Sequence, residues 1–161
     1  MIGAEGKGLS IALGTLQRTR LGAAAQAVGI AQGATDYAAG YARERVVFGR
    51  PIGQNQGIAH PLARCWMNLE AANLMVMKAA SRYDGRMECG AEANAAKYLA
   101  GEAAFHACET AVMTHGGMGY AKEYQVERLF RESILPRFTP ITEQMILNFI
   151  AEKVLDLPRS Y

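Results

Sequence analysis

The chain has 161 residues, which is enough for one domain with a hydrophobic core. Half of the residues are hydrophobic, and 17 basic against 15 acidic side chains give a net charge of +2. Because these charges are balanced and spread along the chain, the composition gives no support for a nucleic-acid or membrane-surface partner. No apolar run is long enough to span a bilayer. Three widely spaced cysteines without a CxxC pair indicate reduced thiols in a cytoplasmic protein.

The first predicted element is a long helix over residues 9–45. Frequent alanine, rare proline and an absence of alternating apolar and polar residues predict an all-α fold. Apolar residues recur every three or four positions over this stretch, which predicts a helix about 50 Å long. Pro51 and the glycines around it end the pattern. A helix of this length needs neighbours of similar length, as in a bundle.

Further helices are predicted at residues 58–83, 91–114, 123–132 and 143–155. Pro136 and Pro140 bracket a segment that is predicted to be non-helical, and Thr142 is placed to cap the last helix. The expected architecture is an antiparallel, up-and-down four-helix bundle with an extra short helix. Residues 1–8, which are rich in glycine, are expected to be a linker from upstream domains that this sequence lacks. Residues 9–161 are expected to form the bundle domain.

Two stretches of the sequence look suited to a large anionic ligand. Residues 45–56 (RVVFGRPIGQNQ) interrupt the helical pattern with two arginines, an aromatic side chain, two glycines and amides, and residues 115–120 (HGGMGY) place three glycines in four positions. Glycines let backbone N–H groups approach a ligand closely, and arginines neutralise phosphate. Either stretch alone could be a polar connection or a helix C-cap. A helical bundle needs neither, so their joint occurrence indicates a ligand site.

At these residues the chain resembles the C-terminal helical domain of the acyl-CoA dehydrogenase family. Residues 45–56 resemble the family's flavin-contacting loop, and residues 115–120, followed by VERLFRE at 126–132, resemble its second flavin-binding segment. The resemblance covers nearly the whole chain. It implies an FAD-dependent flavoprotein and oxidoreductase of fatty acid metabolism that dehydrogenates an acyl-CoA thioester. It also implies a homodimer or homotetramer built through this domain, or a hetero-oligomer, with electron-transfer flavoprotein as the electron acceptor.

The resemblance implies roles for single residues. The cofactor contacts would be Arg45 on the FAD pyrophosphate of a neighbouring subunit, Phe48 on the adenosine side, Gln56 as a nearby hydrogen-bond partner, Gly117 against the adenine half, and Thr142 and Gln144. Arg20 would border the acyl-CoA pocket. Met113 stands where many members of the family have a glutamine that contacts the cofactor. Losing that hydrogen bond, worth roughly 1 kcal/mol, predicts weaker retention of FAD.

One departure from the family concerns the catalytic base. Removal of the α-proton of an acyl-CoA needs a carboxylate within hydrogen-bond reach, while the β-hydrogen leaves as hydride to the flavin. The two positions from which members of the family supply that carboxylate are Thr19 and Pro140 here, and neither side chain can accept the proton. Glu143 is the nearest carboxylate in the sequence and is the candidate base, although its charge would also simply favour a helix N-terminus.

Two other hypotheses explain the same departure. The protein could be a non-catalytic or half-site subunit of a heteromeric dehydrogenase, or it could run flavin chemistry that needs no such base, as in related flavin monooxygenases. The isolated chain is expected to be inactive and nearly free of FAD.

Two hypotheses assign the chain to other classes of protein, namely a purely structural bundle and a ferritin-like di-iron bundle. A di-iron site needs paired Glu-x-x-His motifs on two helices, whereas Glu102 and His106 are four residues apart and no Glu-x-x-His occurs. No metal site is therefore predicted.

Overall fold

Helix α3 (Gly90–His115) is the centre of the fold in the computed structural model, which describes residues 3–159. Around it lie α1 (Gly8–Glu44), α2 (Gln56–Asp84), α4 (Val126–Phe138) and, at one end, α5 (Glu143–Lys153). Thirteen of the 26 residues of α3 are buried, and most of these are alanine or glycine. Such small side chains let the neighbouring helices pack closely on several sides of α3.

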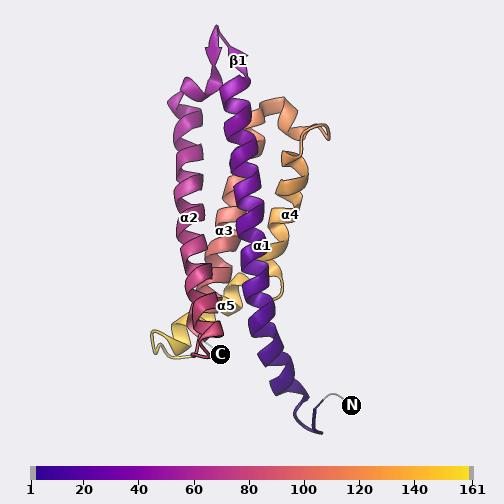
Figure 1. Ribbon diagram of the computed structural model, residues 1–161, viewed down its shortest axis with the longest axis vertical. Helices are drawn as coiled ribbons and strands as arrows, with labels where there is room; N and C mark the ends of the chain where they lie inside the picture. Colours follow the sequence, from indigo (N-terminus) through magenta and orange to yellow (C-terminus); the bar gives the residue numbers. More distant parts are fainter. Residues whose placement is uncertain (1–2, 160–161) are drawn as a thin grey trace.

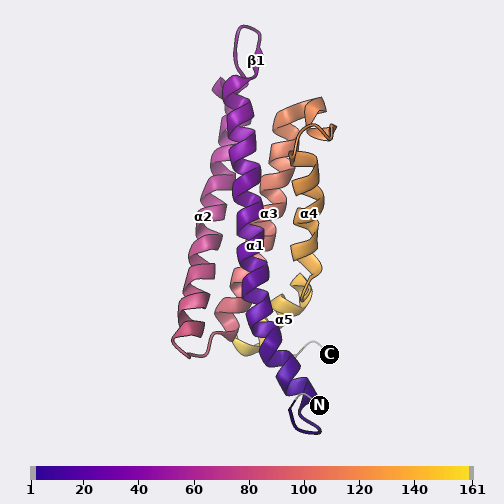
Figure 2. The same ribbon diagram turned by 45° about the vertical axis from the view of Figure 1, so that its right-hand side comes forward.

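The four longest helices run antiparallel to one another in chain order (Figures 1 and 2). On α1 the seam that faces the other helices is made mainly of alanines, at positions 24, 27, 31, 34, 38 and 42. This spacing of three or four residues is the pattern that predicted the helix. The all-α bundle and its extra short helix are therefore confirmed. No helix between residues 3 and 159 is long and apolar enough to cross a membrane.

The end of α4 differs from the prediction. The sequence predicts that this helix ends at Glu132, but it continues through Pro136 to Phe138. A proline removes one hydrogen bond of a helix. Here Pro136 is buried and packs against Gly101 of α3, where a β-carbon would lie 3.6 Å from the Pro136 carbonyl oxygen, and this packing opposes the cost. The non-helical connection is confined to residues 139–142.

Two short connections meet at the end of the bundle where α1 and α3 both end (Figure 1). After α1 the chain forms a small hairpin of β1 (Val46–Val47) and β2 (Arg50–Pro51), then a 3-10 turn, η1 (Ile52–Gln54). After α3 it forms a second 3-10 turn, η2 (Gly116–Tyr120). Helix α5 lies at the other end of the bundle, and Thr142 caps it as predicted, because its hydroxyl oxygen accepts a hydrogen bond from the backbone N–H of Met145.

Candidate functional site

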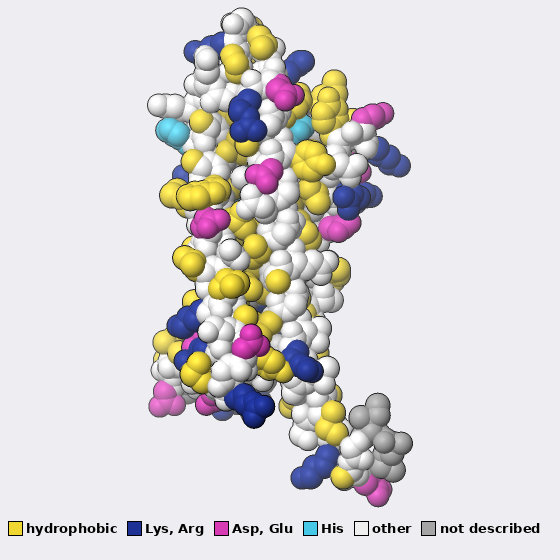
Figure 3. Space-filling view, in the orientation of Figure 1, with side chains coloured by type: hydrophobic (Ala, Val, Ile, Leu, Met, Phe, Trp, Pro, Cys, Tyr) yellow, Lys and Arg dark blue, Asp and Glu magenta, His cyan; other side chains and the backbone are white. Residues whose placement is uncertain are grey.

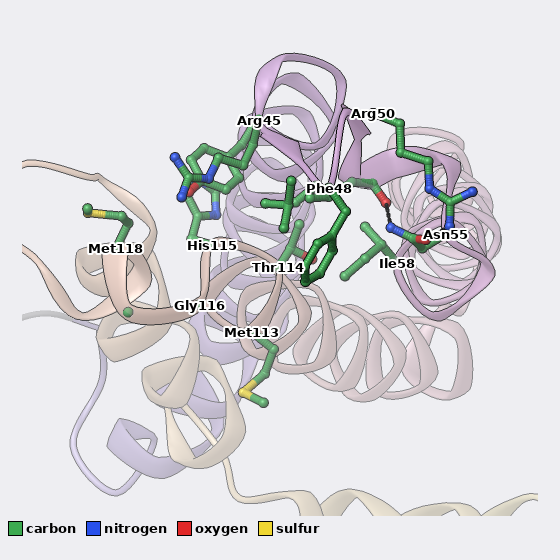
Figure 4. Close-up of a pocket in the computed structure, with 14 residues that line it drawn as sticks. Arg45, Phe48, Arg50, Asn55, Ile58, Met113, Thr114, His115, Gly116 and Met118 are labelled. Atoms are coloured by element: carbon green, nitrogen blue, oxygen red, sulfur yellow. Dashed lines mark hydrogen bonds between the residues drawn. The ribbon is translucent and has the colours of Figure 1, made fainter.

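An open cavity of about 710 Å³ lies between the β1–β2 hairpin and the end of α3 (Figure 4). Its lining comes mainly from the two stretches that the sequence singled out. The lining residues are Tyr41, Arg45, Val47, Phe48, Arg50, Ile52, Asn55, Ile58, Met113, Thr114, His115, Gly116, Gly117 and Met118. The structure thus brings Arg45, Phe48 and Gly117, which are far apart in sequence, to one cavity.

The hairpin is held to the end of α1 by its own backbone. The Arg45 N–H donates to the Tyr41 carbonyl (2.8 Å), and the Arg45 carbonyl accepts from the Ile52 N–H (2.9 Å). The turn itself is formed by Phe48 and Gly49, both in the left-handed region with φ of 52° and 77°. Two-residue hairpins favour this geometry, but a bulky residue such as phenylalanine adopts it only at a cost of about 1 kcal/mol or more.

Phe48 obtains no packing energy within this chain to offset that strain. Its side chain is 100% exposed, and Figure 4 shows the ring projecting over the cavity. A strained backbone that displays a fully exposed aromatic ring is typical of a binding contact. The turn therefore points to a partner or ligand outside this chain.

The cavity carries positive charge. Arg45 and Arg50 line it, and no carboxylate is among the lining residues that the structure describes. The Arg50 Nη2 donates to Asn55 Oδ1 (2.6 Å), whereas Arg45 has no acidic partner within residues 3–159. An exposed guanidinium beside a glycine turn suits an anionic group such as a phosphate.

An aromatic cluster ties the two sides of the cavity together, and the sequence did not predict it. The rings of Tyr41 and His115 stack with centroids 4.2 Å apart and planes 22° apart, and Tyr124 meets both rings edge-on. His115 is buried, and its Nδ1 lies 2.8 Å from the Ala111 carbonyl, to which it donates. The stack joins the end of α1, which carries Arg45, to the residue that precedes Gly116 and Gly117.

Not all of the predicted cofactor residues lie at this cavity. Gln56 is exposed at the start of α2 and does not line the cavity, whereas its neighbour Asn55 does. Thr142 and Gln144 lie at the start of α5, at the opposite end of the bundle (Figure 1). The connection before α5 contacts α3 at Lys97, 16 residues before Met113 of the cavity, or about 24 Å along the helix. The structure therefore divides these residues into two groups.

Arg20 lies near the group formed by Thr142 and Gln144. It is half-buried on α1 and lines a smaller cavity of about 390 Å³ together with Ile141 and Met145. Burial lowers the pKa of its guanidinium. Its Nε is buried without a hydrogen-bond partner among the described residues.

The carboxylate of Glu143 is engaged in an ion pair. Its Oε1 accepts from Arg137 Nε (2.8 Å) and its Oε2 from Arg137 Nη2 (3.0 Å), and only 11% of its side chain is exposed. Nearby Pro140 offers no proton acceptor on its side chain, and the Thr19 hydroxyl donates to the Thr15 carbonyl on the exposed face of α1. Within residues 3–159 no group of three His, Cys, Asp or Glu side chains is placed to hold a metal ion.

Known protein families include one that matches almost the whole of this chain. The family model described as acyl-CoA dehydrogenase, C-terminal domain, matches residues 6–155. The chain belongs to the acyl-CoA dehydrogenase family. The resemblance drawn from residues 45–56 and 115–120 is thereby confirmed.

Relatives in this family agree in sequence and in structure. The chain is 43% identical to the acyl-CoA dehydrogenase FadE12 of Mycobacterium tuberculosis, over 100% of this chain and 42% of the relative. It is 47% identical to the CarC subunit of the caffeyl-CoA reductase–Etf complex of Acetobacterium woodii, over 81% of this chain and 35% of the relative. The butyryl-CoA dehydrogenase structure from Megasphaera elsdenii superimposes with a TM-score of 0.93 at 37% identity, over 95% of this chain and 40% of that one. The chain thus spans about two fifths of the length of the acyl-CoA dehydrogenases it matches.

Proposed function

We propose that this chain is the C-terminal domain of an FAD-dependent acyl-CoA dehydrogenase, an enzyme that removes hydrogen from the α and β carbons of an acyl-CoA thioester. In this proposal residues 1–8 are the linker from upstream domains, and residues 9–161 supply cofactor contacts and an oligomer interface. The observation that carries the proposal is the cavity at which Arg45, Phe48 and Gly117 meet. Its positive charge, its glycine turn and its exposed aromatic ring suit the diphosphate and adenosine of FAD.

The separation of the predicted contacts supports a cofactor that is shared between subunits. Arg45, Phe48 and Gly117 lie at one end of the bundle, and Thr142 and Gln144 lie at the other (Figure 1). We infer that each chain contributes to two cofactors, with the first group reaching the FAD that a neighbouring subunit mainly holds. Gln56, which directly follows Asn55 of the cavity lining, would belong to that first group.

An apolar outer face on α2 supports self-association. Hydrophobic side chains reach the surface over α2, on the left of Figure 3. The large exposed ones recur at helical spacing on this helix, namely Trp66, Met67, Leu74 and Met77. Large apolar patches that remain exposed on a single chain are typical of subunit interfaces. We propose a homodimer or homotetramer.

The flavin, when bound, supplies the hydride acceptor. The part of this chain in the reaction would be to hold the cofactor and, through Arg20, to border the acyl-CoA. Glu143 stays the candidate base on this chain. Because Arg137 donates to both of its oxygens, Glu143 would act as a base only from within this ion pair or after leaving it.

A heteromeric enzyme is the second candidate, and the side chains around Pro140 favour it. Neither Thr19 nor Pro140 offers a carboxylate, and the carboxylate of Glu143 is held by Arg137. In this form the chain would contribute Arg45 and Phe48 to the FAD of a different, catalytic subunit. The name of the caffeyl-CoA reductase subunit places that relative in a complex with Etf, which supports electron-transfer flavoprotein as the electron carrier.

The test uses the full-length polypeptide, expressed alone and with candidate partner subunits. Bound FAD is measured by its visible absorbance, and turnover of an acyl-CoA panel is measured with an artificial electron acceptor. Arg45→Ala should weaken FAD binding at least tenfold, and Arg43→Ala, an exposed arginine in the last turn of α1 outside the cavity, should not. Equal FAD binding by both variants would contradict the proposal. Turnover that Glu143→Gln abolishes would support the base, and turnover only with a second subunit would support the heteromeric form.

A further inference from the structure

The connection between α4 and α5 is held by an arginine for which the family resemblance implies no role. Arg137, in the last turn of α4, donates from Nε and Nη2 to the two oxygens of Glu143, in the first turn of α5. The same Nη2 lies 2.7 Å from Glu102 Oε1 of α3, an ion pair whose alignment is too poor for a hydrogen bond. The guanidinium also stacks over the Phe105 ring, 4.9 Å from its centroid. One side chain thus joins three helices.

A second cation, Lys97, holds the same connection. Lys97 of α3 is only 1% exposed, and its Nζ donates to the Ile141 carbonyl (2.8 Å). Burial lowers the pKa of this ammonium, and the nearby Glu143 carboxylate acts in the opposite direction. The connection is therefore held at Ile141 by Lys97, and Glu143, the first residue after it, is held by Arg137.

The pair of Arg137 and Glu143 lies partly out of solvent. The two side chains are 34% and 11% exposed, and their two parallel N–H···O contacts form the bidentate arrangement that fixes orientation as well as distance. Removing one partner leaves the other charge partly buried and unpaired. The pair with Arg137 is therefore one of the contacts that hold the first turn of α5.

The two residues beside Glu143 are both among the expected contacts of the cofactor. Thr142 comes directly before it, and its hydroxyl is already used as the helix cap, so its rotamer is fixed. Gln144 comes directly after it, and its side chain is exposed and available to a ligand. A shift of the Glu143 backbone would displace both neighbours.

We propose that Arg137 is a positioning residue for the cofactor, which holds Glu143 against α3 and thereby sets Thr142 and Gln144 in the orientation that contacts the flavin. The inference rests on the proposed function. It adds a residue outside both flavin-binding segments, one that touches neither cofactor nor substrate.

The experiment compares three variants of the full-length polypeptide. Arg137→Gln removes the charge, Arg137→Lys retains it without the bidentate fork, and Arg82→Gln is the matched control. Arg82 is 36% exposed, pairs with Glu92 (3.3 Å) and donates to the Glu88 carbonyl, so it also holds a helix connection, but the one between α2 and α3. For each variant we would measure the dissociation constant of FAD, the absorbance spectrum of bound flavin, kcat, KM and the melting temperature.

The expected result is specific to the flavin. Arg137→Gln should weaken FAD binding or lower kcat about tenfold and change the flavin spectrum, while KM for the acyl-CoA stays within about twofold. Arg137→Lys should restore part of the loss. Arg82→Gln should lower the melting temperature without changing the spectrum. A folded Arg137→Gln variant with wild-type spectrum, affinity and kcat would overturn the inference, as would an equal loss in Arg82→Gln.

A further variant keeps the inference testable if Arg137→Gln does not fold. Glu102→Gln weakens one ion pair of Arg137 and leaves the hydrogen bonds to Glu143 in place. It should reduce FAD affinity or kcat about threefold with the same spectral change, and an unchanged enzyme would count against the inference. A wild-type protein that binds no FAD would instead overturn the proposed function itself.

Discussion

Replacing Gly117 by alanine separates the folding role of the glycine turn from its role at the cofactor. In this chain nothing lies within 4 Å of a β-carbon placed on Gly117, and its φ is not in the left-handed region. Alanine therefore fits the fold. Because alanine restricts the unfolded chain more than glycine does, Gly117→Ala should be neutral or raise the unfolding free energy by about 0.4–1 kcal/mol.

The cofactor should respond in the opposite direction. If the Gly117 backbone lies against the adenine half of FAD, the new methyl group occupies space that the nucleotide needs. Insertion of a methyl group into a packed contact costs about 1–3 kcal/mol, which corresponds to a loss in FAD affinity of roughly 5- to 150-fold. The assay is a fluorescence titration of FAD against the full-length apoprotein, with thermal melts of the same samples.

Gly119→Ala is the matched comparison. A β-carbon at Gly119 would collide with the Val112 carbonyl oxygen and lie 3.0 Å from Val112 Cα, and the site is buried. This variant should lose about 1–3 kcal/mol of stability. A Gly117→Ala protein that melts as wild type and binds FAD as wild type would refute the reasoning, because the backbone of Gly117 could then not lie at the cofactor.

Three further predictions follow from single side chains. Phe48→Asn should raise the unfolding free energy by roughly 0.5–1 kcal/mol, because asparagine tolerates the positive φ, yet weaken FAD binding; a loss of stability would show that the ring packs within the chain. His115→Leu should cost about 1 kcal/mol of stability and weaken FAD binding, because it removes the stack with Tyr41 and one hydrogen bond, and unchanged binding would contradict the proposed tie. Burial raises the pKa of Cys108 from 9.0 to about 12, so its contribution to stability is complete below pH 9 and is lost as the pH rises toward 12. The difference in unfolding free energy between the wild type and Cys108→Ala should therefore be about 2 kcal/mol smaller at pH 10.5 than at pH 8, as measured by denaturation. A difference that does not change with pH would contradict this.

The helices could be predicted from the sequence because their signals are local. The small residues of α1 recur with the period of a helix face, and Thr142 stands directly before the helix that it caps. The end of α4 could not be predicted in this way. Whether Pro136 ends a helix depends on its contact with Gly101, and that contact joins residues 35 positions apart that no local pattern connects.

The candidate site could be predicted in part, and for a similar reason. Glycines and arginines in the sequence indicate the two segments that line the cavity. Only the family resemblance indicates that Arg45 and Gly117 face one ligand. The stack of Tyr41 on His115 depends on how α1 packs against α3, so no local sequence pattern predicts it. The engagement of Glu143 by Arg137 likewise becomes visible only once α4 is known to extend to Phe138, which places Arg137 on the helix.

A mixed assembly tests most directly whether one chain serves two cofactors in a homo-oligomer. Arg45→Ala and Gln144→Ala subunits would be co-expressed with different affinity tags, and assemblies that contain both would be isolated and titrated with FAD. If Arg45 reaches the cofactor of a neighbouring subunit, half of the sites in a mixed dimer combine an intact Arg45 with an intact Gln144. We expect half of the sites to bind FAD with wild-type affinity, although an assembly of either variant alone contains no wild-type site. A titration with every site weakened and no wild-type class would contradict it.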